Sequence, residues 1–255
     1  MSGDGCVVVT GASDGIGMTI ARRLIARGVN VLAVARRADR LEALCGTAEN
    51  ARFAAVDLES ADSVEVVARA VKNTFGIVRG FVHCAGFNQL APLSLVDPVV
   101  AQRLYAVHAL FPMKFMGWLG KAPNHVEGTA CVLISSLACH EGAAGNAAYA
   151  AAKGAVEGML KASAAELVGR GVRVNAIAPG FVETEMARET WKSLRATPEK
   201  IAELEKSYPL GFGKPEQIAD VVDFLLGGAS SWMTGQCLVV DGGHGIVRSW
   251  DCGIV

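Results

Sequence analysis

The feature that most constrains the fold is a short apolar run followed at once by a glycine-rich turn and an amphipathic segment. Residues 6–9 are mostly β-branched, which is typical of a buried strand. The turn at 10–17 reads Thr-Gly-Ala-Ser-Asp-Gly-Ile-Gly, and helically spaced apolar residues follow it up to a glycine stop at Gly28. Glycine lets the backbone approach a pyrophosphate, and a helix amino terminus favours an anion. This order predicts a dinucleotide-binding unit, although a glycine-rich chain can also produce the spacing by accident.

A second pattern places a serine, a tyrosine and a lysine as S-x12-Y-x3-K behind an apolar run at 131–134. Three alanines separate Tyr149 from Lys153, so the segment is predicted to be helical with both side chains on one face. Because an ammonium stabilises a nearby phenolate, we expect Lys153 to lower the pKa of Tyr149 from its ordinary value near ~10. Tyr149 would then exchange a proton near neutral pH, and Ser136 would orient the oxygen concerned. One Y-x3-K pair also arises by chance, so its weight comes from the glycine turn before it.

Strand-like and helical segments alternate along the chain without a linker, a repeat or a low-complexity tract. Strands are expected at 5–10, 30–35, 51–56, 79–84, 130–135, 172–178 and 236–241. Helices are expected at 15–27, 38–45, 61–74, 98–119, 147–169 and 215–227. The alternation predicts an α/β fold: one doubly wound Rossmann domain over 1–255, with a seven-stranded parallel sheet covered on both faces.

The stretch 181–212 breaks this alternation, because it mixes large apolar side chains with many charges. Its large side chains include Phe181, Met186, Trp191, Leu194, Leu204, Tyr208 and Leu210. An insertion of this length between two strands is a candidate substrate lid. The alternative is a helical pair that only packs on a neighbour.

Composition argues against several other classes. The formal net charge is −1 without a basic cluster, so nucleic acid is not an expected partner. No run of about eighteen residues is free of polar interruption, so no membrane span is expected, and the first residues lack the features of a signal peptide. The seven cysteines include no C-x-x-C pair. We therefore expect buried reduced thiols, no metal site and a cytoplasmic protein.

The motifs, in this order, resemble the classical short-chain dehydrogenase/reductase family over nearly the whole chain, and within it the 3-oxoacyl-(acyl carrier protein) reductase-like group. The glycine turn matches the TGxxxGxG motif of the family, and the serine, tyrosine and lysine match its active site. The family stretch NxxxPGxxxT reads from 175 to 184, and its last strand and turn resemble 234–243.

Two positions depart from the family pattern. The family usually has N-N-A-G after its fourth strand, whereas 83–86 read His-Cys-Ala-Gly. The family also has an Asn that helps hold a water connected to the active-site lysine, and His108 stands at the matching position. Because imidazole also holds a water, His108 is interpreted as a catalytic replacement, with packing between helices as the alternative. His83 is interpreted as structural.

The end of the second strand bears on the choice of cofactor. An acidic side chain there would accept the ribose hydroxyls of NAD, but the sequence has Ala35 followed by Arg36 and Arg37. A guanidinium pairs well with a phosphate, so we expect NADP(H), against the alternative of two solvated arginines. Asp14 argues mildly the other way, because many NADP-binding relatives carry a basic residue in this turn. Asp57 matches a family residue that contacts adenine, or else it caps the following helix.

The resemblance implies this full set of cofactor contacts: Gly11, Ser13, Asp14, Gly15, Ile16, Gly17, Arg36, Arg37, Asp57, Leu58, Ala85, Gly86, Tyr149, Lys153, Pro179, Gly180, Val182 and Thr184. It also implies hydride transfer between the nicotinamide and a carbonyl carbon. Tyr149 would protonate the carbonyl oxygen, Lys153 would hold the ribose, and Thr184 would fix the carboxamide. The expected reaction is NADPH-dependent reduction of a ketone, 3-oxoacyl or polyketide-like, to a secondary alcohol. The alternatives are a dehydrogenase of a small alcohol, sugar or steroid-like substrate, and a non-catalytic nucleotide-binding relative.

Two further expectations concern partners. Carrier-protein reductases bind an acidic carrier with basic residues near the active-site mouth. Arg170 matches one of these residues, but Glu127 stands at the other position with Lys121 nearby, and this weakens the case for a carrier protein.

The helices at 98–119 and 147–169 carry surplus small and apolar residues. This surplus predicts a homotetramer with two-fold interfaces; the alternative is a monomer with alanine-rich helices. The surplus residues are Leu104, Leu110, Phe111, Met113, Phe115, Trp118, Ala151, Ala155, Met159, Ala162 and Ala165.

Overall fold

The computed structural model describes residues 5–246; the predictions that concern 1–4 and 247–255 lie outside them. Seven parallel strands form one sheet in the order β3-β2-β1-β4-β5-β6-β7. The strands are β1 (Cys6–Thr10), β2 (Val31–Ala35), β3 (Ala51–Ala55), β4 (Val78–His83), β5 (His125–Ile134), β6 (Arg173–Pro179) and β7 (Cys237–Val240). The predicted parallel sheet is thereby confirmed.

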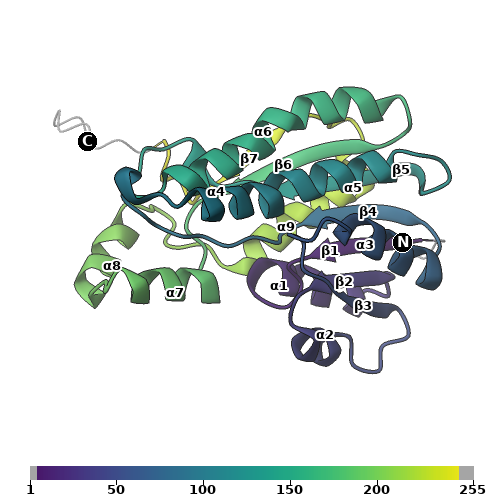
Figure 1. Cartoon of the computed structure of the whole chain (residues 1–255), viewed down its shortest axis with the longest axis horizontal. Helices are drawn as coiled ribbons and strands as arrows, with labels where there is room; N and C mark the ends of the chain where they lie inside the picture. Colours follow the sequence, from purple (N-terminus) through teal and green to yellow (C-terminus); the bar gives the residue numbers. More distant parts are fainter. Residues whose placement is uncertain (1–4, 247–255) are drawn as a thin grey trace.

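Helices cover both faces of the sheet (Figure 1). One face is covered by α1 (Gly15–Ala26), α2 (Ala38–Cys45) and α9 (Pro215–Leu226). The other face is covered by α3 (Ser63–Thr74), α5 (Phe111–Leu119) and α6 (Ala147–Val168). Helix α4 (Pro98–Tyr105) lies beside α6. Successive strand side chains enter opposite layers, so Val7 joins the first core and Val8 the second. The doubly wound Rossmann arrangement is confirmed, and its two-sided burial explains why the inner strands are apolar throughout.

One predicted strand begins in the wrong place. Strand β5 starts at His125 instead of 130. His125 pairs with Val78 and Ala130 with Gly80, so the first half of β5 carries extra residues opposite β4. Extra residues that bulge from a ladder break the period-two pattern on which the sequence prediction depended.

The predicted single helix at 98–119 is also wrong. A π-helical turn, Ala106–Leu110, separates α4 from α5. Pro112 lacks an N–H, and in a regular α-helix its ring would clash with the carbonyl of His108 four residues earlier. A wider turn relieves this conflict, and the N–H of Phe111 accordingly bonds to the carbonyl of Ala106.

The insertion at 181–212 folds as two helices, α7 (Glu185–Ser193) and α8 (Pro198–Lys206), at one end of the molecule (Figure 1). The pair has an aromatic core of its own: the Phe181 ring stacks on Trp191 at 4.8 Å and contacts Phe212 at 4.5 Å. Thr184 and Thr197 cap the two helices. Within residues 5–246, no helix has the length and apolar character needed to cross a membrane.

Candidate active site

The predicted serine, tyrosine and lysine meet at the carboxyl end of β5. Ser136 follows the strand, and Tyr149 and Lys153 lie on consecutive turns of α6. Lys153 is buried; its Nζ donates to the carbonyl of Ile134 at 2.7 Å and lies 5.7 Å from the centroid of the Tyr149 ring. The Ser136 Oγ accepts from the N–H of Ala138 at 3.1 Å, which leaves its own proton available for another oxygen.

The expected lowering of the Tyr149 pKa is wrong for this structure. Burial raises the pKa of Tyr149 to about 12, and this outweighs the hydrogen bond with Ser136 that lowers it. Burial also lowers the pKa of Lys153 to about 8. With a pKa of about 8, Lys153 keeps most of its charge at neutral pH, and with a pKa of about 12 Tyr149 keeps its proton.

His83 has a structural role, in agreement with its interpretation from the sequence. Its Nδ1 lies 2.8 Å from the Thr10 Oγ1, and its Nε2 lies 3.0 Å from the Val107 carbonyl oxygen. Burial lowers the pKa of His83 to about 3, so the ring is neutral, with its hydrogen on the nitrogen that faces the carbonyl. His83 thus ties the ends of β1 and β4 to the π-helical turn.

That turn places His108 beside Tyr149. The two rings meet edge to face, with centroids 5.5 Å apart and planes at 87°. The Nε2 of His108 lies 2.9 Å from the Phe87 carbonyl oxygen, whereas its buried Nδ1 has no hydrogen-bond partner among the described residues. Burial lowers the pKa of His108 well below its ordinary value, so the ring is neutral. A side chain on Gly86 would come within 2.1 Å of the His108 Cε1, so only glycine leaves room for this ring.

The glycine turn leaves a backbone cradle that fits a dinucleotide. Gly11 has a φ of +68°, and a Cβ on Gly17 would lie 2.4 Å from the Gly11 carbonyl oxygen. Thr184, at the start of α7, lies against the same turn, because a Cβ on Gly15 would come within 3.2 Å of its Cγ2. Bare backbone at the start of a helix is what a pyrophosphate needs.

The other predicted cofactor residues gather at the same edge of the sheet, because the carboxyl ends of parallel strands lie together. They are Asp57 and Leu58 after β3, Ala85 and Gly86 after β4, and Pro179, Gly180 and Val182 at the end of β6. Asp57 is exposed and accepts from the N–H of Glu59, whereas the cap position of α3 belongs to Asp62. Asp57 therefore does not cap that helix.

The arginines after β2 behave differently from one another. Arg36 is exposed, whereas Arg37 donates to the Ser13 hydroxyl at 3.1 Å and pairs with Asp14 and Glu185, each at 3.3 Å. Arg40 joins the same group, at 2.8 Å from Glu185 and 3.0 Å from Asp14. We call Asp14, Arg37, Arg40 and Glu185 the arginine cluster.

The sequence analysis missed two members of this cluster. Arg40 lies three residues after Arg37, so a helical projection of α2 would have placed the two arginines together. Glu185 stands 145 residues away from Arg40, and no local pattern points to it. Its position joins the first turn of α7 to the glycine turn.

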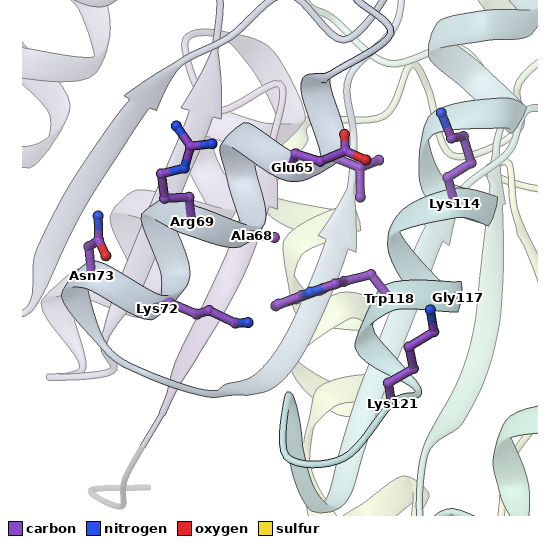
Figure 2. A pocket seen from close by; sticks show the side chains of 10 residues that line it. Glu65, Ala68, Arg69, Lys72, Asn73, Lys114, Gly117, Trp118 and Lys121 are labelled. Carbon is purple, nitrogen blue, oxygen red and sulfur yellow. The ribbon is translucent and has the colours of Figure 1, made fainter.

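A groove of about 680 Å³ lies elsewhere, between α3 and α5 (Figure 2). It is lined by Val64, Glu65, Ala68, Arg69, Lys72, Asn73, Lys114, Gly117, Trp118 and Lys121. None of the predicted site residues lines it, so this groove is separate from the active site.

Two of the observations behind the expected partners differ in the structure. Arg170 follows α6, and Tyr149 lies near its start; a helix of 22 residues puts them roughly 30 Å apart. Arg170 of the same chain is therefore not near the mouth of this active site.

The residues that were counted as surplus differ in burial. Four of them are buried in the chain's own interior, namely Leu104, Phe111, Phe115 and Met159. Others are exposed: Leu110, Met113, Ala151, Ala162 and Ala165.

Comparison with known proteins matches residues 11–245 to the family described as enoyl-(acyl carrier protein) reductase. The chain is 35% identical over 244 residues to D-threitol dehydrogenase from Mycolicibacterium smegmatis, covering 94% of this chain and 92% of the relative. It is 34% identical over 247 residues to the 3-oxoacyl-(acyl-carrier-protein) reductase of Thermotoga maritima, covering 92% and 96%. A tryptophan variant of actinorhodin polyketide ketoreductase, solved with NADPH, superposes with a TM-score of 0.85 at 27% identity, over 96% of this chain and 98% of that one.

Proposed function

The chain belongs to the short-chain dehydrogenase/reductase family of oxidoreductases, and we propose that it uses NADPH to reduce a ketone of the 3-oxoacyl or polyketide type to a secondary alcohol. The observation that carries this proposal is the meeting of Ser136, Tyr149 and Lys153 at the sheet edge that also holds the glycine turn. A non-catalytic nucleotide-binding relative would have no use for this complete set.

The chain's own residues account for the proton chemistry. A nicotinamide cofactor, when bound, supplies the hydride. Tyr149, protonated at neutral pH, donates its proton to the carbonyl oxygen of the substrate, and the Ser136 hydroxyl holds that oxygen. Lys153 keeps at least two N–H groups beyond its bond to Ile134, and these can hold the ribose hydroxyls. The Nδ1 of His108, which pairs with no group in the described part of the chain, can accept from a water that returns a proton toward Lys153.

The choice of NADP(H) is supported by the positive charge after β2. Arg36 and Arg37 follow the strand where an acidic residue would otherwise receive the ribose hydroxyls. The arginine cluster holds two guanidinium and two carboxylate groups, so exposed Arg36 adds an unbalanced positive charge to this surface. A 2′-phosphate would complement that charge. The polyketide ketoreductase to which the chain is similar was solved with NADPH.

A second candidate function is oxidation of a small polyol. It is favoured by the 35% identity to D-threitol dehydrogenase. Tyr149 would then act as the base and would have to lose its proton, although burial raises the pKa of Tyr149 to about 12.

The decisive experiment measures cofactor oxidation with acetoacetyl thioesters and cyclic ketones, and cofactor reduction with tetritols and hexitols, each with both nicotinamide cofactors. We expect the highest kcat/KM with NADPH and a ketone. Faster turnover of a polyol with NAD⁺ would favour the second candidate. Turnover of neither class, with intact cofactor binding, would argue for a non-catalytic protein.

We further propose a cytoplasmic homotetramer in which α7 and α8 act as a lid over the substrate. The exposed side chains Leu110, Met113, Ala151 and Ala162 lie on the π-helical turn, α5 and α6, and they would form one two-fold interface. Sedimentation equilibrium at micromolar concentration gives the mass directly. A fully active monomer would show that these residues are not an interface.

A further inference from the structure

Four side chains that the proposed reaction does not use meet at a single carboxylate oxygen. The Oε1 of Glu157 lies 2.8 Å from the His140 Nε2, 3.1 Å from the Cys139 Sγ and 3.5 Å from the Cys237 Sγ. It also accepts from the hydroxyl of buried Ser135 at 2.7 Å. Three separate segments contribute: the turn after Ser136, the middle of α6 and the start of β7.

The donor set is the one that zinc prefers. Thiolate, imidazole and carboxylate are the three ligand types of protein zinc sites, and tetrahedral sites with two sulfur ligands are typical of zinc. The ligand atoms of Cys139, His140 and Glu157 all lie within 4.8 Å of one another. Around a zinc ion, with bonds of about 2.0–2.3 Å, tetrahedral ligand atoms lie roughly 3.3–3.8 Å apart. The ligand atoms of these three residues therefore lie within about 1 Å of the spacing that zinc requires, whereas the Cys237 Sγ lies outside this group and touches only its Glu157 member, at 3.5 Å, so it would have to move further to complete the tetrahedron.

We propose that Cys139, His140, Glu157 and Cys237 form a zinc site that fastens the segment after Ser136 to α6 and β7. Three of these residues are only partly buried and the His140 side chain is 36% exposed, so an ion has a path from solvent. Ser135 serves as the outer partner that orients the Glu157 carboxylate, as hydrogen-bonded groups around metal ligands do.

The protonation of the cysteine ligands before zinc binds sets how many protons binding releases. A cysteine thiol ordinarily carries its proton near pH 7, so both thiols are protonated before the ion binds. Zinc binds thiolates, so forming the two Zn–S bonds breaks two S–H bonds and releases about two protons to the solvent. The Glu157 carboxylate and the His140 imidazole supply the other two ligands. No oxidation or reduction takes place.

The position of the zinc site also affects the active site. Cys139 lies one turn after Ser136, and Glu157 lies one turn after Lys153 on α6. A zinc ion held by both would fix the spacing between Ser136 and the helix that carries Tyr149. Zinc here acts by positioning, because none of its ligands is Ser136, Tyr149 or Lys153.

The test is titration of chelator-treated, fully reduced protein with Co²⁺ and Zn²⁺. We expect one Co²⁺ per chain with a thiolate-to-cobalt charge-transfer band, displaced by Zn²⁺. Calorimetry in buffers of different ionisation enthalpy should show about two protons released per zinc in the wild type and about one in Cys237→Ser. Glu157→Gln should weaken zinc binding at least about tenfold, whereas Cys45→Ser, a buried cysteine on α2, should leave it unchanged.

Saturating zinc should also raise the melting temperature by several degrees in the wild type and in Cys45→Ser, but not in Cys139→Ser. Circular dichroism of each metal-free variant checks that it is folded. Absence of the charge-transfer band, or its persistence in Cys139→Ser, would overturn the site. Release of only one proton per zinc would overturn the role of Cys237. The proposal would also be refuted if protein prepared without reductant contained a Cys139–Cys237 disulfide and took up no zinc after reduction.

Discussion

The imidazole of His108 meets the Tyr149 ring edge to face, with centroids 5.5 Å apart, and within residues 5–246 its Nδ1 has no hydrogen-bond partner. If that nitrogen holds a relay water, His108→Asn should keep most of the activity and His108→Leu should reduce it strongly, because leucine offers no acceptor. Steady-state rates measured beside melting temperatures distinguish relay from packing. A well-folded, fully active leucine variant would refute the relay.

Tyr149→Phe should leave the fold and cofactor binding intact but remove nearly all turnover. Only the hydroxyl that donates the proton is lost, and general acid catalysis is commonly worth ~10²–10⁴-fold. Steady-state kinetics beside a cofactor titration by fluorescence separate the two effects. Retention of more than about a tenth of wild-type kcat would contradict the proposed role.

Arg36→Asp should turn a preference for NADPH into a preference for NADH. The lost charge-assisted bond to the 2′-phosphate costs about 1.5–3 kcal/mol, and the new carboxylate repels the phosphate. The measurement is kcat/KM for both cofactors in the wild type and the variant. Arg69→Asp, the same change at an exposed position on α3, is the control and should leave the ratio unchanged. Equal use of the two cofactors by the wild type would count against the assignment.

Glu185→Gln should strengthen NADPH binding several-fold and leave NADH binding unchanged. Hydrogen bonds from Arg40 and its neighbours lower the pKa of Glu185 to about 2, so this carboxylate is charged at neutral pH and competes with a phosphate for Arg37. Fluorescence titration with each cofactor provides the measurement. Glu189→Gln, an exposed change on the same helix, is the control. An equal effect on both cofactors would mean that Glu185 acts on the lid alone.

Lys153→Met should be inactive, yet more stable than the wild type near pH 7. Because the folded-state pKa of Lys153 is about 8, below its ordinary 10.5, its buried charge destabilises the fold at pH values below 8. As the pH rises from 8 to 10.5, the folded state loses its proton before the unfolded state does, so the wild type gains about 3 kcal/mol relative to the variant. Urea unfolding at about pH 7 and about pH 10 measures the difference. A constant difference would contradict the pKa shift.

The order of the strands and the proposed catalytic serine, tyrosine and lysine were predictable, because each comes from a local pattern, whereas the π-helical turn that divides 98–119 was not. A β-branched run and a glycine turn before an amphipathic segment predict a strand and a helix start from neighbouring residues alone, and the Y-x3-K pair gains its weight from the glycine turn before it. The parallel sheet then places the strand ends together, which is why Gly17, Ser136 and Pro179 fall at one edge.

The charge state of Tyr149, the arginine cluster and the convergence on Glu157 came only from the tertiary structure. From the sequence, the spacing of Tyr149 and Lys153 predicts a lowered pKa, but burial sets the opposite direction. Arg40 meets Glu185 across 145 positions, and Cys237 meets Glu157 across 80. Local patterns determine which elements form, whereas burial and long-range contacts depend on how those elements pack, and these decide the protonation and the charge of the site.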